Sequence, residues 1–265
     1  MESMRRDRLI NSLLLLLIAA GAFFGLAPFL APTWFAVLTG FVGTDLFIYR
    51  LAGAATFGYA VGLAVGFRSG WENLRIPIAA TAVFNGASIF ACVAAIASGP
   101  QPVVFVILAA SILFTPATTY FLASPPASRV AMDAAAAVVR DDFAPWVIVL
   151  FVIGTLAAAF FGLAPLLFGG SFGQLLGYSG ADDFVYRQGG AATLGAAVGG
   201  LLVLGTRRWS AARIPAIMAV TFNGLAVVAA IVEIVNGGQP IALLILAAAG
   251  LTTVGMLAAL ARGGR

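Results

Sequence analysis

Long runs of hydrophobic residues, separated by short polar segments, dominate the chain. Several runs reach the roughly 20 residues that an α-helix needs to cross the hydrocarbon core of a bilayer. Pro, Gly, Arg and Asp recur in the segments between them. We therefore predict an all-α polytopic membrane protein. Its eight transmembrane helices are expected at Leu9 to Pro28, Asp45 to Phe67, Arg75 to Ile96, Val103 to Leu122, Trp146 to Phe168, Asp183 to Leu204, Ile214 to Val235 and Ile241 to Ala261.

Shorter segments between the spans carry weaker helical patterns. Phe35 to Phe41 follows Trp34, a residue type typical of the membrane–water interface, and is expected to form a short interfacial helix. The Ala-rich stretch Val130 to Val139 is expected to form a surface helix within a cytoplasmic linker, residues 124–145. Pro77 is expected in the first turn of its span, where proline is tolerated. Pro116 lies inside its span and should bend it.

An internal repeat organises the chain. The stretch from Asp45 to Gly58 returns as Asp182 to Gly195, 137 residues later. Further landmarks follow in the same order, among them Phe-Asn-Gly at Asn85 and again at Asn223. We predict two four-helix repeats, residues 1–123 and 146–265. Four spans is an even number, so the repeats should be parallel and related by a pseudo-two-fold axis along the membrane normal.

The first span follows a basic start, as the apolar segment of a signal peptide does. Its end, Ala22 to Pro28, is however repeated internally at Ala159 to Pro165. An internal segment cannot be a cleaved leader. We therefore expect the first span to be retained.

Composition supports the membrane class and suggests an orientation. Of 265 residues, 62% are hydrophobic and 9% charged, against about 25% charged in soluble domains. The net charge of +4 comes from 14 basic residues, all Arg. Twelve are expected on the side of both termini, and only Arg50 and Arg187 on the other. The positive-inside rule then places both termini in the cytoplasm of a bacterial inner membrane, and nucleic acid is not needed as a partner.

The residue types missing from the sequence exclude several kinds of metal, cofactor and catalytic site. The chain has no His and a single Cys, Cys92. This excludes His-ligated haem or metal and His general-base catalysis, so no metal and no cofactor is predicted. Asp, Glu, Tyr and Cys92 remain for acid–base work, and they do not cluster in the sequence. The sequence therefore favours a protein that is not an enzyme, with intramembrane catalysis as a minor alternative.

Two Tyr-Arg pairs, Tyr49-Arg50 and Tyr186-Arg187, are the first candidate site. Each Arg should lie about 7 Å inside its helix start, where a charge costs up to a few kcal/mol unless it is paired or reaches the interface. In one interpretation each Arg extends to the outer headgroups and each Tyr joins the aromatic belt. In the other, both Arg face the interior and bind an anionic headgroup or solute.

Acidic residues near these pairs are candidate partners. Asp183 precedes Arg187 by four residues, so the two can meet on one helix face. Asp45 and Asp182 stand five residues before their Arg, which fits less well. Glu233, for which the first half has Ala95, is expected near the outer end of its span. It is either an interfacial carboxylate or a counter-ion for one of the two Arg.

Asn85 and Asn223 should lie about 15 Å inside the membrane, near its midplane. An interhelical hydrogen bond is the usual use of an amide at that depth, and a ligand contact or water path is the alternative. Small residues at intervals of four predict close helix packing on the second and sixth spans, which should be central. These are Ala54, Gly58, Gly62 and Gly66, and their counterparts Ala191, Gly195 and Gly199.

Each half shows a span ending in Pro, an interfacial stretch, and a span with Arg followed by small residues. In the sequence these are Pro28 with Arg50-Leu51-Ala52-Gly53, and Pro165 with Arg187-Gln188-Gly189-Gly190. Each unit resembles the DoxX-like small bacterial four-helix membrane proteins. The chain departs from them by fusing two units. The resemblance implies a fold more than a function.

Short loops, apolar packing faces and the missing catalytic set favour a non-catalytic accessory or scaffold subunit of a membrane complex. The alternative is a carrier or binding protein for a small anion or lipid, which would use the Arg, Tyr and Asp cluster. The expected partners are membrane lipids and other membrane-protein subunits.

Overall fold

The computed structural model describes residues 2–135 and 143–264, without the side chains of residues 2–6 and 133–135. This part of the chain is built from α-helices, and eight of them are long and apolar enough to cross a membrane. The prediction of an all-α protein with eight spans is confirmed. The long helices are α1 (Glu2–Leu30), α3 (Leu46–Gly66), α4 (Trp71–Ala97), α5 (Pro102–Ala123), α7 (Pro145–Phe168), α9 (Asp183–Thr206), α10 (Trp209–Val235) and α11 (Ile241–Ala261).

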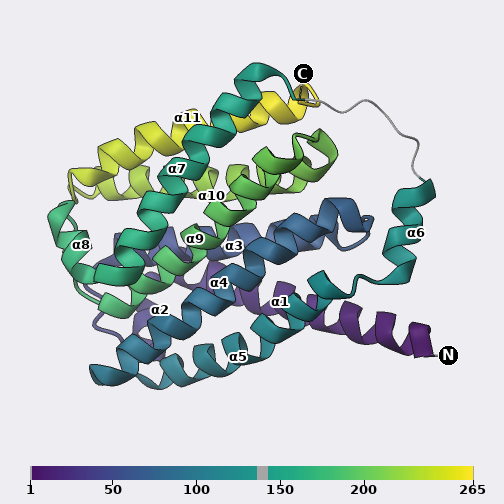
Figure 1. The fold of residues 1–265 in the computed structure, drawn as a ribbon. Coiled ribbons are helices and arrows are strands. Elements are labelled where there is room, and N and C mark those ends of the chain that lie inside the picture. The colour runs from purple at the N-terminus through teal and green to yellow at the C-terminus, as the bar shows by residue number, and fades with distance from the viewer. Residues whose placement is uncertain (1, 136–142, 265) are drawn as a thin grey trace.

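The helices form an elongated bundle with two distinct ends (Figure 1). Both chain termini and α6 (Ala127–Ala135) lie at one end, here called the terminal end. The short helices α2 (Pro32–Thr39) and α8 (Gly170–Leu175) lie at the other, here called the α2/α8 end. Ala144, just before α7, donates its backbone N–H to the carbonyl of Gly264 at 2.9 Å. The halves therefore both begin at the terminal end.

Local signals explain most helix boundaries, with one correction. Pro102 and Pro145 stand in the first turns of α5 and α7, where a missing N–H costs nothing. The prediction that Pro77 also stands in a first turn is wrong, because α4 begins at Trp71. Glu72 lies in that first turn, where an acidic side chain favours the helix dipole. Helix α2 overlaps the short helix that was predicted at Phe35 to Phe41, whereas α8 was not predicted. The interfacial position of α2 stays a prediction.

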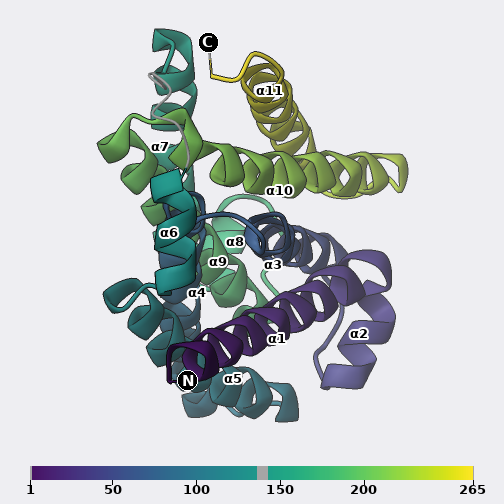
Figure 2. The ribbon, with the colours of Figure 1, turned by 90° about the vertical axis from the view of Figure 1, so that its right-hand side faces the viewer.

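Each inner helix packs on an outer helix of its own half and on an inner helix of the other half. Helix α3 packs on α1 and α10, and α9 packs on α7 and α4, whereas α3 and α4 touch each other little. Helices α3 and α9 also meet, and the Tyr59 hydroxyl donates to the Ala192 carbonyl at 2.6 Å. Both lie in the middle of the bundle when it is viewed from the terminal end (Figure 2). The two halves therefore share one core.

Glycines allow these close approaches. Gly58 lies against the carbonyl oxygen of Met218 on α10, and Gly62 against the Met218 side chain. A Cβ on Gly195 would come within 2.5 Å of the Ala80 carbonyl on α4. Gly66 faces Leu74 and Ile214, and Gly199 faces Ala80. The small-residue stripes thus lie where α3 meets α10 and where α9 meets α4.

Matching helices of the two halves make matching contacts. Helix α1 packs on α3 as α7 packs on α9, and α4 on α5 as α10 packs on α11. The pairs that cross between the halves, α3 with α10 and α9 with α4, correspond in the same way. The two-repeat arrangement and its axis along the membrane normal stay a prediction, for which superposition of the halves is the direct test.

Helix α6 covers the first part of the predicted surface helix at Val130 to Val139, and residues 136–139 lie outside the described part. Arg129 on α6 is buried, although its sequence position indicated an exposed loop charge. Its guanidinium donates to the carbonyls of Ser69 and Phe67, both at 2.8 Å, and to the side-chain oxygen of Asn11 at 3.0 Å. Burial lowers the pKa of Arg129, and the charge of Asp7 opposes this. Arg129 thus attaches the linker to the C-terminal end of α3.

Candidate functional site

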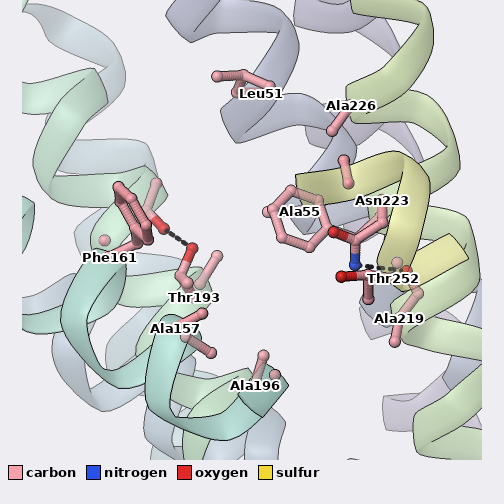
Figure 3. Close-up of a pocket in the computed structure, with 18 of the residues that line it drawn as sticks. Leu51, Ala55, Ala157, Phe161, Thr193, Ala196, Ala219, Asn223, Ala226 and Thr252 are labelled. Carbon is pink, nitrogen blue, oxygen red and sulfur yellow. Dashed lines mark hydrogen bonds between the residues drawn. The ribbon is translucent and has the colours of Figure 1, made fainter. Parts of the chain in front are cut away.

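One cavity in the described structure has a volume of about 290 Å³ and is here called the larger cavity. It lies among α3, α7, α9, α10 and α11, with α8 at one end (Figure 3). Its wall is mostly alanine, glycine and aromatic side chains, and no Arg, Asp or Glu of the described residues lines it. The site is therefore apolar and uncharged.

The larger cavity is long as well as apolar. Along α7 its lining residues run from Phe151 to Pro165. At 1.5 Å per residue this is about 21 Å, which exceeds the roughly 15 Å half-thickness of a hydrocarbon core. An extended chain, rather than a compact molecule, matches this shape.

The same cavity is bounded on its outer side by two helices that meet only near the terminal end. There the Leu150 side chain lies against Gly255, and Ala144 is hydrogen-bonded to Gly264. Beyond this point α7 and α11 diverge (Figure 1), and they make few contacts although both line the cavity. The cavity therefore lies beside two helices that separate away from the terminal end.

A few polar groups interrupt the apolar wall. Asn223 donates from Nδ2 to the Ala219 carbonyl of its own helix at 2.8 Å (Figure 3). The Thr193 and Thr252 hydroxyls also bond to carbonyls of their own helices. The buried Thr155 hydroxyl has no hydrogen-bond partner among the described residues. Asn223 thus makes no interhelical bond in the described structure and instead lines a cavity.

A second cavity of about 140 Å³, here called the smaller cavity, lies among α1, α3, α4, α5 and α9. Many of its lining residues are the counterparts of those in the larger cavity. Asn85, Tyr49 and Phe24 are at the positions equivalent to Asn223, Tyr186 and Phe161. Asn85 likewise donates to a carbonyl of its own helix, that of Thr81, at 2.8 Å. Each half therefore contributes one midplane Asn to a cavity.

The two cavities differ in bulk and polarity. Phe114 of the smaller cavity is at the position equivalent to Thr252 of the larger cavity. Likewise, Tyr59 is at the position equivalent to Ala196. The larger side chains fill space and account for the smaller volume. In addition, Ser88 and Ser111 line the smaller cavity where the larger has Ala226 and Ala249. Tyr59 and Ala52 line both cavities and so lie between them.

Asp45 is the centre of a polar cluster at the α2/α8 end. It is 0% exposed, and its carboxylate accepts from four donors. These are the Ile48 N–H at 3.3 Å, the Ser179 hydroxyl at 2.9 Å, the Gln239 amide at 3.1 Å and the Tyr186 hydroxyl. Three of them belong to the second half. Asp45 therefore joins the start of α3 to the loops before α9 and α11.

Asp182, the counterpart of Asp45, is bound differently. It has a φ of 57°, in the left-handed region, and accepts the backbone N–H groups of Val42 at 2.8 Å and Gly43 at 3.0 Å. The Tyr49 hydroxyl lies close to its carboxylate but makes no hydrogen bond among the described residues. Each carboxylate thus holds the opposite half, and the carboxylate of Asp45 accepts a hydrogen bond from Tyr186.

Tyr178 completes the wall between the Asp45 cluster and the larger cavity. Its ring packs edge-on against Tyr186 and stacks with Phe47, and it lines the cavity together with Tyr186. Burial raises the pKa of Tyr178, and the charge of Asp45 raises it further. The hydroxyl therefore stays protonated and neutral at physiological pH.

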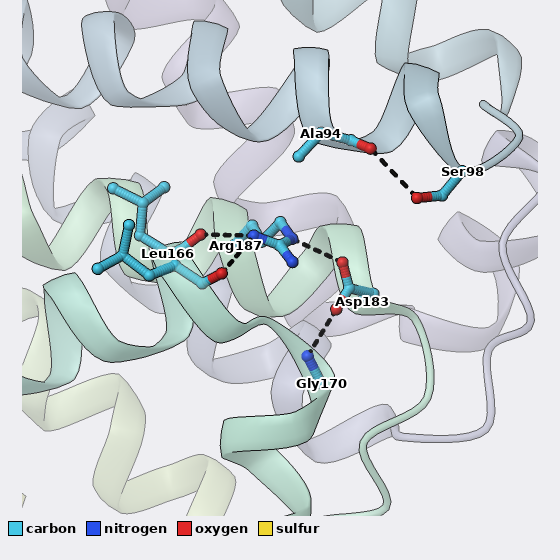
Figure 4. A network of polar contacts seen from close by, with 7 residues as sticks. Ala94, Ser98, Leu166, Gly170, Asp183 and Arg187 are labelled. Carbon is cyan, nitrogen blue, oxygen red and sulfur yellow. Dashed lines mark hydrogen bonds and ion pairs between the residues drawn. The ribbon is translucent and has the colours of Figure 1, made fainter.

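Arg187 is held by three protein oxygens (Figure 4). Its Nε donates to Asp183 at 2.6 Å, and one terminal nitrogen donates to the carbonyls of Leu166 at 2.8 Å and Leu167 at 2.9 Å. Asp183 also accepts the Gly170 N–H at 2.8 Å. These carbonyls belong to the last turn of α7, where no backbone donor follows. Arg187 thus closes the end of α7.

Arg50 has no hydrogen bond or salt bridge among the described residues. Leu46 stands where the second half has Asp183, so the partner four residues earlier is missing. The carboxylate whose charge acts on Arg50 is Glu233, which also accepts the Gln239 N–H at 3.1 Å. Neither Arg50 nor Arg187 lines either cavity. The role of Glu233 as a counter-ion stays a prediction.

Sequence reasoning did not identify several residues of the cluster. Asp45 accepts from Ser179 and Gln239, and Tyr178 packs against Tyr186, the tyrosine bonded to Asp45. These three residues lie in loops more than 130 positions from Asp45 along the chain. Gln239 was visible as half of a repeated Gln-Pro pair. Nothing in the sequence linked that pair to a carboxylate in the other half.

Comparison of the chain with protein-family models, curated proteins and solved structures gives no match. The likeness to the DoxX-like proteins therefore stays a prediction.

Proposed function

We propose that this integral membrane protein binds a lipid by inserting one hydrocarbon chain of the lipid into the larger cavity. The observation that carries the proposal is the uncharged, elongated cavity of about 290 Å³ between α7 and α11. Its length and its position beside two helices that separate fit a chain that enters sideways. The proposal corresponds to the binding-protein alternative drawn from the sequence, with a lipid rather than a small anion as ligand.

The positions of the charges favour a lipid over a small anion. Arg187 forms a salt bridge with Asp183 and donates hydrogen bonds to two carbonyls at the end of α7. Arg50 and Arg187 both lie outside the lining of either cavity. A small anion in these uncharged cavities would lose its hydration without gaining a charged partner, at a cost of several kcal/mol or more.

Selectivity of such a site has to come from shape and polar groups. Lipid tails are as apolar as the cavity wall, so moving a chain from bilayer to protein gains little hydrophobic free energy. The rings of Phe161 and Phe222 and the small residues of α9 set the outline of the cavity. The Asn223 and Thr155 side chains provide hydrogen-bonding groups within it.

The role of accessory or scaffold subunit, first favoured from the sequence, stays a prediction, as does the expectation that the protein is not an enzyme. We also propose that the terminal end faces the cytoplasm of a bacterial inner membrane, which the arginine count supports. A reporter fused after Ala261 tests the orientation, and reporter activity on the periplasmic side would contradict it.

The test of lipid binding is a cavity-filling variant, Ala196→Phe. Ala196 lines the larger cavity from the middle of α9, and its counterpart Tyr59 already fills the equivalent space in the other half. The matched control is Ala247→Phe, on an exposed face of α11 outside the cavity lining. The protein is purified from membranes in a mild detergent, and the lipid that remains bound is identified and counted by native mass spectrometry.

We expect the unsubstituted protein and Ala247→Phe to retain about one lipid per chain, and Ala196→Phe to lose it while keeping its unfolding temperature within a few degrees. If all three proteins hold the same lipids in the same amounts, the cavity is not the binding site. Absence of any bound lipid from the unsubstituted protein would also reject the proposal.

A further inference from the structure

The smaller cavity contains hydrogen-bonding groups that the protein itself does not use. Ser111 on α5 is 2% exposed and lines the cavity, and its hydroxyl makes no hydrogen bond among the described residues. Asn85 on α4 is also buried, and only its Nδ2 is bonded, to the Thr81 carbonyl. Its Oδ1 has no donor among the described residues. A buried polar group without a partner costs about 1–3 kcal/mol, so a ligand that bonds it recovers that energy.

Two further polar side chains of this cavity already bond to each other. The Ser88 hydroxyl donates to Oε1 of Gln188 at 2.8 Å, and Nε2 of Gln188 lies 3.8 Å from the Cys92 sulfur. This pair fixes the Gln188 amide. Ser111, Asn85 and the Tyr49 hydroxyl, which also has no hydrogen-bond partner among the described residues, remain as groups available to a ligand. None of the described residues that line the smaller cavity is charged.

Aromatic rings form most of the remaining wall. Eight aromatic residues line the cavity, namely Phe24, Phe35, Phe41, Tyr49, Tyr59, Phe84, Phe114 and Phe184. Such rings favour the faces and edges of another ring, by about 0.5–1.5 kcal/mol for each pair beyond the area they bury. The volume of about 140 Å³ is close to the roughly 150 Å³ of an engineered apolar cavity that takes up benzene. One six-membered ring therefore matches the size.

We propose that the smaller cavity is a binding site for a single neutral aromatic ring that carries a hydroxyl group. A phenolic hydroxyl both donates and accepts, so it can donate to Oδ1 of Asn85 and accept from the hydroxyl of Ser111. The larger cavity has Ala249 in the place of Ser111, and its hydroxyl without a partner, that of Thr155, comes from α7 instead. The inference concerns a second site and does not depend on lipid binding in the larger cavity.

The experiment compares p-cresol with toluene, two ligands of similar shape that differ by one hydroxyl. Binding to the purified full-length protein is measured by equilibrium dialysis against detergent of the same concentration and by the shift of the unfolding temperature. We expect p-cresol to bind about tenfold to a hundredfold more tightly than toluene, the ratio that two neutral hydrogen bonds provide.

Two variants make the test specific. Ser111→Ala should reduce the preference for p-cresol by about threefold to tenfold, which is the loss of one hydrogen bond, while toluene binding stays unchanged. Ser111→Leu should abolish binding of both ligands by filling the cavity, and Ala110→Leu serves the same purpose if that variant does not fold. Thr252→Ala, which removes a hydroxyl from the larger cavity instead, is the matched control and should bind as the unsubstituted protein does.

Equal binding of p-cresol and toluene would overturn the proposal, and so would p-cresol binding that survives Ser111→Leu or Ala110→Leu. Failure of the unsubstituted protein to bind p-cresol would overturn it as well. The Ala196→Phe variant separates the two sites, because it should lose lipid and keep p-cresol.

Discussion

Arg187 and Arg50 occupy equivalent positions in the two halves, yet only Arg187 is held by protein groups. Arg187 bonds to Asp183 and to two carbonyls at the end of α7. Arg50 has Leu46 in place of that aspartate, and the charge of Glu233 acts on it. The two arginines therefore differ both in the residue one turn earlier on the helix and in their bonds to the end of the preceding helix.

The aspartates that begin the same two helices differ as well. Asp45 is fully buried and accepts from three side chains of the other half. Asp182 is partly exposed and accepts from two backbone N–H groups. The aspartate therefore makes more hydrogen bonds in the first half, and the arginine makes more in the second.

The largest effect is expected when the two aspartates are replaced in turn. Asp45→Ala leaves buried donors of Ser179, Gln239 and Tyr186 without an acceptor and should cost about 3 kcal/mol or more of unfolding free energy. Asp182→Ala removes two bonds at a partly exposed site and should cost about 1 kcal/mol. Unfolding in a denaturing detergent, followed by circular dichroism, measures both values. Equal losses would mean that the Asp45 cluster does not carry the connection between the halves.

For the arginines we expect the opposite order, with the larger loss of unfolding free energy in the second half. Arg187→Met removes charge-assisted hydrogen bonds to Asp183 and to the end of α7, and should cost about 2 kcal/mol. Arg50→Met keeps an unbranched apolar stem, removes the charge and should cost less than about 1 kcal/mol. The same unfolding assay compares them. A loss for Arg50→Met as large as that for Arg187→Met would reveal a partner for Arg50 that the described residues do not contain.

The smallest effect is a gain, obtained by giving the first half the aspartate of the second. Leu46→Asp places a carboxylate four residues before Arg50, the spacing that Asp183 has to Arg187. An ion pair at this spacing stabilises a helix by about 0.2–0.5 kcal/mol. The double variant Leu46→Asp with Arg50→Met is the control, because it should lose the gain. If the gain in stability persists without Arg50, it comes from the interaction of the new carboxylate with the helix dipole and not from an ion pair.

Local patterns predicted the fold well because membrane helices are specified by local sequence. The eight spans follow from runs of apolar residues, and the contact between Asp183 and Arg187 follows from their spacing on one helix. The start of α4 was less accurate, since Trp71 to Leu74 is polar enough to resemble a loop. Helix α8 was missed because Gly170 to Leu175 is short and rich in glycine.

The candidate sites were much harder to predict, because they depend on contacts between distant segments. Asp45 meets Tyr186 only when the second helix of one half lies beside that of the other. A cavity exists where side chains are too small to fill the space, as at Ala196, and no spacing rule reveals which alanines face one another. The two midplane asparagines were found from the sequence, but their hydrogen bonds within their own helices were not.

The exchange of packing partners between the halves has a consequence for any shorter form of this chain. Helix α3 relies on α10, and α4 relies on α9, for most of the surface that they bury outside their outer partners. A gene that encoded only one half would leave both inner helices uncovered in the bilayer. Such a product could complete its interior only by pairing with a second molecule. With both halves in one polypeptide, this pairing forms within the chain and does not depend on protein concentration.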